Sequence, residues 1–261
     1  MKALSTAATG MLAQQLNVEV ISNNIANMNT TAYKRRRAEF QDLLYQSIER
    51  VGANSSAQGT VVPSGVQVGV GVRTAGVYRI SSQGSLELTD NPLDLAINGR
   101  GFFRVQDPNG EQLYTRSGSF QLDQDGRLVT TDGFEVLPGI NVPQEARDIV
   151  INQEGEVQVL LDGQINPQVV GQLDLAIFPN DAGLEAIGSN LFRETQASGN
   201  ATVATPGTDG FGVVEQGFLE RSNVDPVQEI TSLITAQRAY ELNSRVITTS
   251  DEMLSAVNNL R

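Results

Sequence analysis

The sequence predicts an α+β protein in which long N- and C-terminal helices pair in coiled-coil fashion and an all-β domain is inserted between them. Two observations predict the helices, because apolar residues recur at heptad spacing near both ends of the chain. A third predicts the inserted domain, since short apolar runs separated by turn residues fill the middle. We expect a discontinuous helical domain over residues 1–34 and 222–261, an extended connecting segment over residues 35–75, and a β-rich domain over residues 76–221.

The N-terminal helix is predicted over residues 3–28 by two rows of residues spaced seven apart. The first row is Leu4, Met11, Val18 and Ile25, and the second is Ala7, Gln14, Ile21 and Met28. Such a narrow stripe is typical of a coiled coil rather than of the wider apolar face of a globular helix. Gly10 lowers the helix propensity of this segment by about 1 kcal/mol relative to Ala.

The C-terminal helix is predicted from Val227 onward by the same kind of pattern. One row is Leu233, Tyr240, Ile247 and Leu254, and the other is Ala236, Asn243, Ser250 and Val257. Asp225 and Pro226 form a typical helix start, with a side-chain acceptor at the cap and Pro in the first turn.

Neither seam looks sufficient for a stable isolated pair. Gln14, Asn243 and Ser250 are polar, and apolar residues off the seams would stay exposed on a two-helix hairpin. The off-seam residues are Ala3, Ala8, Leu12, Leu16 and Val20 on the first helix and Ile230, Ala239, Val246, Met253 and Leu260 on the second. We therefore expect helices that order fully only when neighbouring subunits cover them; the alternative is a helix pair packed on its own β domain.

The middle of the chain is predicted to be β structure. Residues 52–65 are rich in Gly, Ser and Ala and indicate a loop, and Val66–Val72 alternates like a strand. Asx-Gly pairs predict type I′ hairpin turns at 98–99, 109–110, 125–126, 132–133 and 162–163. The expected strands are 94–97, 101–105, 113–116, 128–130 and 173–178.

The composition excludes several classes of function. The 261 residues include no His, no Cys and no Trp, so a Ser-His-Asp triad, a thiolate nucleophile, a typical zinc site and disulfides are all ruled out. A formal net charge of −12 argues against binding to nucleic acid. No apolar run reaches the roughly 18 residues of a membrane span, and the N-terminus lacks the continuous apolar region of a secretory signal. We predict no enzyme activity, no cofactor and no metal site.

Three weaker motifs are better explained without a ligand. Residues 121–126, with Asp132 further on, resemble part of a calcium loop, but Gln121 and Asp132 stand where such a loop has Asp and Glu, so a hairpin turn is preferred. Gly69 and Gly71 lack the third glycine of a dinucleotide fingerprint. The basic run 34–37 is interpreted as a solvated or subunit-contacting patch.

Residues 21–34, ISNNIANMNTTAYK, followed by RRRAEFQDLLYQ, closely resemble the N-terminal signature of bacterial flagellar rod and hook proteins, which runs roughly N-x-A-N-x-x-T-x-G-Y/F-K. The matching positions are Asn24, Ala26, Asn27, Thr30, Tyr33 and Lys34. Ala32 stands where the family usually has Gly, and a positive φ there would cost Ala about 1 kcal/mol or more. Segments 98–105, 114–136 and 217–254 also resemble blocks of that family.

The resemblance implies a structural subunit that polymerises with copies of itself into a rigid hollow helical tube and transmits torque from motor to hook. The helices would line the inner tube, and the β domain would form the outer layer. Chain length and residues 45–72 favour a distal-rod subunit; the alternatives are a hook or proximal-rod subunit, or, in a different class, a periplasmic cell-wall-binding or wall-cleaving protein. The implied partners are proximal rod subunits, hook protein, surrounding ring proteins and the flagellar type III export apparatus. The implied location is the basal body in the periplasm, reached without a cleaved signal.

We predict that a set of helix residues carries the packing between subunits. They are Leu4, Ala7, Met11, Val18, Ile21, Ile25, Met28, Leu233, Tyr240, Ile247, Leu254 and Val257.

Overall fold

The structure is a computed structural model that describes residues 2–48, 65–161 and 166–259. Within those residues it contains two long α-helices, α1 (Lys2–Ala26) and α2 (Pro226–Asn259), one short 3-10 helix (Asp181–Gly183) and many strands. The predicted α+β class is confirmed. The sequence-predicted loop at 52–65 and the turn at 162–163 lie almost entirely outside the described residues.

The chain divides into two compact units. The first contains Met1–Ala26, Arg36–Tyr78 and Asp225–Arg261, and the second contains Asn27–Arg35 and Arg79–Val224. The chain therefore passes from one unit to the other four times. The three-part division expected from the sequence stays a prediction.

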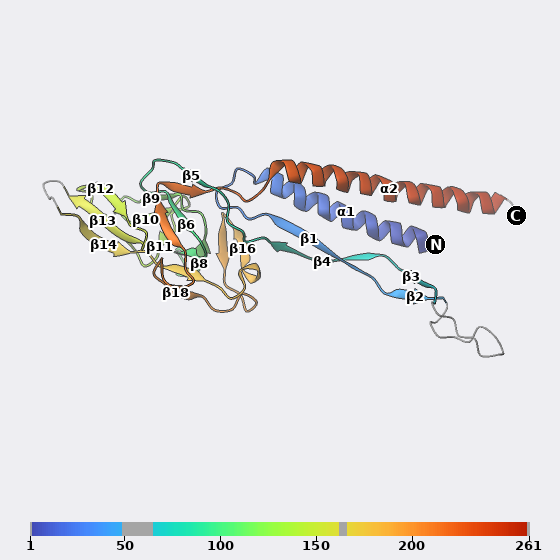
Figure 1. Ribbon diagram of the computed structural model, residues 1–261, viewed down its shortest axis with the longest axis horizontal. Coiled ribbons are helices and arrows are strands. Elements are labelled where there is room, and N and C mark those ends of the chain that lie inside the picture. Colours follow the sequence, from blue (N-terminus) through green and yellow to red (C-terminus); the bar gives the residue numbers. More distant parts are fainter. Residues whose placement is uncertain (1, 49–64, 162–165, 260–261) are drawn as a thin grey trace. The chain divides into compact units, whose positions relative to one another are not determined.

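The first unit contains α1 and α2, which lie side by side and run in opposite directions (Figure 1). The Asp225 carboxylate caps α2 by accepting hydrogen bonds from the backbone N–H groups of Val227 (2.9 Å) and Gln228 (3.3 Å). This satisfies two of the donors that a helix start leaves unpaired, so the predicted helix start is confirmed.

A long two-stranded ribbon completes the first unit. Strand β1 (Arg36–Asp42) pairs with β4 (Val72–Arg79), and β2 (Tyr45–Ser47) pairs antiparallel with β3 (Gln67–Gly69). The single strand predicted over residues 66–72 is wrong, because the chain leaves the ladder between β3 and β4, where Gly71 has φ 134°. Its carbonyl accepts the backbone N–H of Leu43 at this break (2.9 Å).

The second unit is built on a nine-stranded sheet. Its main path runs β16-β17-β8-β7-β11-β10-β9, and β15 joins β7 and carries β18 at its other edge. The bounds are β7 (Phe102–Gln106), β8 (Gln112–Thr115), β9 (Phe120–Leu122), β10 (Leu128–Thr130), β11 (Glu135–Val136), β15 (Leu175–Ile177), β16 (Glu185–Gly188), β17 (Leu191–Arg193) and β18 (Thr202–Ala204).

Three smaller sheets belong to the same unit. Strands β12 (Ala146–Ile151), β13 (Glu156–Leu161) and β14 (Gln168–Gln172) form an antiparallel sheet. Strand β6 (Leu95–Asn98) pairs with β19 (Val213–Gln216), and β5 (Leu86–Leu88) pairs with β20 (Phe218–Glu220). The core lies between these strands and includes the fully buried side chains of Phe103, Phe120, Ile97, Leu173 and Leu175.

The Asx-Gly pairs at 109–110, 125–126 and 132–133 join hairpin strands as predicted. The predicted turn type is wrong, because only the glycines Gly110, Gly126 and Gly133 have positive φ, and the preceding Asn or Asp does not. A type I′ turn needs positive φ at both positions. In the hairpin of Gly126, the backbone N–H of Gly126 donates to Asp123 and that of Asp123 to Arg127, the pattern of a longer loop closed by a glycine.

Candidate assembly surface and chain junction

Most of the buried apolar residues of α1 and α2 are small. Ala7, Ala13 and Ile21 are buried on α1, and Ala236 and Ser250 are buried on α2. The two helices approach closely near Gly10, where an added Cβ would lie 3.0 Å from the Asn243 Nδ2 atom. Of the large apolar residues that the structure describes on the two helices, only Ile21 is buried.

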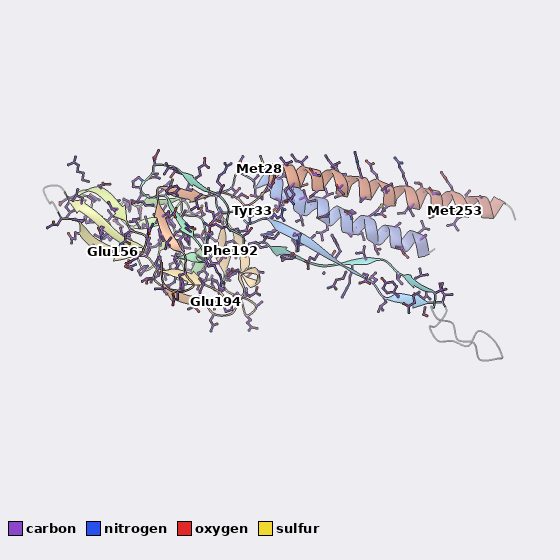
Figure 2. All side chains as sticks on the ribbon, in the orientation of Figure 1. Met28, Tyr33, Glu156, Phe192, Glu194 and Met253 are labelled. Atoms are coloured by element: carbon purple, nitrogen blue, oxygen red, sulfur yellow. The ribbon has the colours of Figure 1, made fainter. Side chains whose placement is uncertain are left out.

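Several large apolar residues on the two helices are exposed. Leu12 on α1 is 67% exposed, and on α2 Val227 is 75%, Leu242 62% and Met253 59% exposed. Further exposed residues on α2 are Ile230, Ile234, Tyr240, Val246 and Leu254. Met253 lies toward the C-terminal end of α2 (Figure 2). An exposed apolar surface that runs along a helix is typical of a protein interaction site.

The residues predicted to carry subunit packing fall into three groups. Ala7 and Ile21 are buried in the first unit, and Tyr240 and Leu254 are exposed. The half-buried group is Leu4, Met11, Val18, Ile25, Met28, Leu233 and Ile247. The side chain of Val257 lies outside the described part of the chain. Half-buried side chains keep part of their surface exposed, and their role in subunit packing stays a prediction.

The signature segment reverses the chain after α1. Asn24 is buried, and its amide pairs with the Arg36 backbone in both directions, donating to the carbonyl (2.8 Å) and accepting from the N–H (2.9 Å). The same amide donates to the Glu229 carboxylate at 3.1 Å. Asn24 therefore joins the end of α1 to the start of β1 and to the first turn of α2.

The signature residues Asn27 and Thr30 lie in a turn of the second unit, whereas Ala26 ends α1. The Asn27 side chain accepts a hydrogen bond from the Thr30 hydroxyl at 3.1 Å. Ala32 is buried and has φ 57°, so this position does require the left-handed backbone that glycine adopts without strain. The Ala32 N–H donates to the Glu220 carbonyl at 2.7 Å.

A buried ionic cluster centres on Glu220. Its carboxylate accepts hydrogen bonds from Lys34 Nζ (2.5 Å), Arg116 Nε (2.7 Å) and the Gly84 backbone N–H (2.8 Å). Arg116 also donates to the carbonyls of Ile97, Gly99 and Gly101. The cluster thereby fastens residues from four distant parts of the sequence to one another.

The electrostatics of this cluster favour the ionised form of Glu220 only because its cationic partners are in place. Burial disfavours the Glu220 carboxylate, but Arg116 and Lys34 outweigh burial and hold its pKa below the ordinary value of 4.5. Burial lowers the pKa of the Lys34 ammonium from 10.5, against the opposing attraction of Glu220. A carboxylate that is 1% exposed and contacts two cations is a structural group.

The interpretation of Lys34 as part of a solvated or subunit-contacting patch is wrong. Its side chain is 7% exposed and is committed to Glu220, whereas Arg36 and Arg37 of the same basic run are exposed. Sequence reasoning missed Glu220 and Arg116, because positions 104 and 186 residues apart give no periodic signal.

The suspected calcium loop is a hairpin between β9 and β10. Over residues 2–48, 65–161 and 166–259, no group of three or more Asp, Glu, His or Cys residues is placed to hold a metal ion. Neither helix, as far as the structure describes it, is long and apolar enough to cross a membrane.

Three family profiles match the chain, and all three describe flagellar hook or rod proteins. The profile "Flagella basal body rod protein" matches residues 4–34, "Flagellar hook protein FlgE/F/G D1 domain" matches residues 96–159, and "Flagellar basal body rod FlgEFG protein C-terminal" matches residues 215–260. These matches cover both terminal helices and part of the β domain.

Curated relatives match over the whole length. The flagellar basal-body rod protein FlgG of Caulobacter vibrioides is 62% identical over 100% of both chains. The proteins of the same name from Agrobacterium fabrum and Bacillus subtilis are 52% and 40% identical, over 99% and 100% of this chain and 98% and 99% of their own. The chain therefore belongs to the flagellar basal-body rod protein family.

Membership makes this chain a structural protein of the flagellar rod, located in the flagellar basal body. The expectation that it is not an enzyme is confirmed, since the family is structural. Among solved structures, the flagellar hook protein FlgE2 of Helicobacter pylori is 16% identical over 71% of this chain and 43% of its own length. Its TM-score is 0.24.

Proposed function

We propose that this chain is a subunit of the distal rod, and that copies of it polymerise into a rigid hollow helical tube that transmits torque from motor to hook. The observation that carries the proposal is the set of exposed apolar residues on α1 and α2, with Leu12, Val227 and Leu242 each more than 60% exposed. Covering such residues is worth about 1.5–3 kcal/mol for each side chain. Neighbouring copies would supply that cover.

The proposal extends to the arrangement of the tube and to its partners. The terminal helices would pair as a coiled coil and line the inner tube, and the β-rich domain would form the outer layer. Proximal rod subunits, hook protein and ring proteins would contact this polymer in the periplasm. The flagellar type III export apparatus would deliver the chain without a cleaved signal. Full-length relatives named as rod proteins support a rod subunit over a hook subunit.

The decisive experiment separates assembly from folding. Leu242→Asp places a charge at an exposed apolar position of α2, and Gln237→Asp places the same charge at an exposed polar position of the same helix. We expect the unfolding free energies of both variant monomers to lie within about 1 kcal/mol of that of the wild type, because neither site is buried. Only Leu242→Asp should prevent polymers from forming in sedimentation and negative-stain microscopy, and only it should abolish swimming when expressed in cells lacking the native protein.

Two results would contradict the proposal. Normal polymers of Leu242→Asp would show that the exposed apolar surface around Leu242 is not an assembly surface. A large loss of monomer stability in Leu242→Asp would show that this surface is already packed within its own chain.

Deletion of residues 46–63, most of which lie outside the described part, tests the distal assignment, because a distal rod should then become more flexible.

A further inference from the structure

The second unit contains a small basic cavity, and only two of its four cationic side chains belong to the ionic cluster around Glu220. It has a volume of about 220 Å³, and four cationic side chains line it: Lys34, Arg79, Arg100 and Arg116. The whole chain has only 18 basic residues against 30 acidic ones. Four cations gathered in one cavity of an acidic protein are a local reversal of charge.

The carboxylates at this cavity balance only part of that charge. Glu220 neutralises one charge of the Lys34 and Arg116 pair, and Asp181 is the acidic residue in the lining. Taken together, the lining and Glu220 carry two positive charges in excess. An excess of this kind in a partly enclosed space attracts anions more strongly than the same charges spread over a surface.

Packing holds the walls of the cavity in place. The Arg79 guanidinium lies 4.2 Å from the centre of the Phe192 ring and donates to the Leu184 carbonyl at 3.1 Å. Phe192 is marked within the β-rich unit in Figure 2. Arg116 is held by three backbone carbonyls as well as by Glu220. Rigid cationic walls lose little entropy when a ligand binds.

Arg100 provides the hydrogen-bonding capacity. Its side chain is exposed at the cavity and donates one hydrogen bond to the Phe178 carbonyl at 3.3 Å. A guanidinium has five N–H donors in a planar fork, which matches the two oxygens of a carboxylate or phosphate. Gly99 and Gly101 flank Arg100, and both have a positive φ, of 117° and 142°.

We propose that this cavity binds a small oxyanion, a carboxylate or phosphate group, and that Arg100 is its principal hydrogen-bond donor. Two sources share that chemistry: a free anion, or an acidic side chain from a neighbouring copy of this chain. The second source rests on the proposed polymer. The binding measurement below does not, so the two proposals can fail separately.

The first experiment titrates inorganic phosphate into the monomeric full-length chain by isothermal titration calorimetry, at low and constant ionic strength because salt screens such sites. Arg100→Gln is compared with Arg127→Gln, which removes the same charge from an exposed site where Arg127 pairs with Asp125 and Glu135. We expect saturable binding to the wild type and to Arg127→Gln, and affinity about tenfold weaker in Arg100→Gln. Arg100→Lys keeps the charge but loses the planar guanidinium. Its phosphate affinity should lie between those of the wild type and Arg100→Gln.

Two outcomes would overturn the proposal: no saturable phosphate binding to the wild type, or equal weakening by Arg100→Gln and Arg127→Gln. A circular dichroism melt of each variant verifies that it is folded before titration.

A second experiment identifies the source of the anion. Phosphate that slows polymerisation of the wild type but not of Arg100→Gln identifies a carboxylate of a neighbouring copy as the occupant, and phosphate that binds without this effect identifies a free anion.

Discussion

The Lys34 ammonium lies 2.5 Å from the Glu220 carboxylate, although the two residues stand 186 positions apart. Lys34 ends the signature turn, and Glu220 ends β20, shortly before α2 begins. Arg116 reaches the other oxygen of the same carboxylate at 2.7 Å. Within the second unit, the buried Glu220 carboxylate therefore links the segment that follows α1 to the segment that precedes α2.

Glu220→Gln should destabilise the second unit strongly. The substitution keeps the size of the side chain but leaves Lys34 and Arg116 buried without their counter-charge, which costs about 3–5 kcal/mol. Urea unfolding of the monomer followed by circular dichroism measures the effect. The control is Glu87→Gln, because Glu87 is 60% exposed in its pair with Arg221 and should change stability by less than about 0.5 kcal/mol. Equal small effects at both sites would mean that the buried cluster adds nothing to stability.

The same cluster predicts a specific acid sensitivity. The pKa of Glu220 is lower in the folded protein than its ordinary 4.5, so the folded state binds this proton less readily than the unfolded chain. The stabilisation is complete above pH 4.5 and is lost as the pH falls through the folded pKa. The difference in unfolding free energy between wild type and Glu220→Gln should therefore be constant above about pH 5 and shrink below pH 4.5. A difference that stays flat down to pH 3 would contradict this account.

The left-handed backbone at Ala32 can be tested with two substitutions. Ala32→Gly relieves the strain at φ 57° but loses a buried methyl group and loosens the unfolded chain, so we expect stability within about 1 kcal/mol of the wild type. Ala32→Val should cost about 2 kcal/mol or more, since a β-branched side chain is strained at positive φ and Ala32 is buried. Thermal unfolding of both monomers measures this. Equal stability of the Val and Gly variants would exclude strain at this turn.

Local patterns in the sequence predicted the helices and several strands well. The heptad rows placed α1 and α2 to within a few residues, and the strand predicted at 128–130 coincides with β10. These elements depend on near neighbours in the chain. Asn98-Gly99 shows the limit, because β6 pairs with β19 rather than with β7. Gly99 instead permits a close approach, since a Cβ there would lie 2.8 Å from the Gly212 Cα.

The residues of the candidate site also divide into those that a local sequence pattern indicates and those whose roles depend on distant partners. The signature drew attention to Asn24 and Lys34, but it gave no indication that Asn24 bonds the Arg36 backbone or that Lys34 is buried. Those roles depend on partners brought together by the fold. Some of the exposed apolar residues were predictable, because Leu12, Val246 and Met253 lie off the seams and the structure leaves them exposed. Val227 and Leu242, which are more exposed than Met253, were not among the off-seam residues.

Helices α1 and α2 approach closely where Gly10 faces the Asn243 side chain. Gly10→Ala gains about 1 kcal/mol of helix propensity, but its Cβ would lie 3.0 Å from Asn243 Nδ2, so the side chain must move. We expect the single variant to be near wild-type stability. In an Asn243→Ala background the same change should stabilise the monomer by about 1 kcal/mol, because the obstructing amide is absent. The four proteins of this double-mutant cycle, unfolded at concentrations below those of polymer formation, give the coupling directly. A coupling of zero would show that the two helices do not meet at this pair of residues.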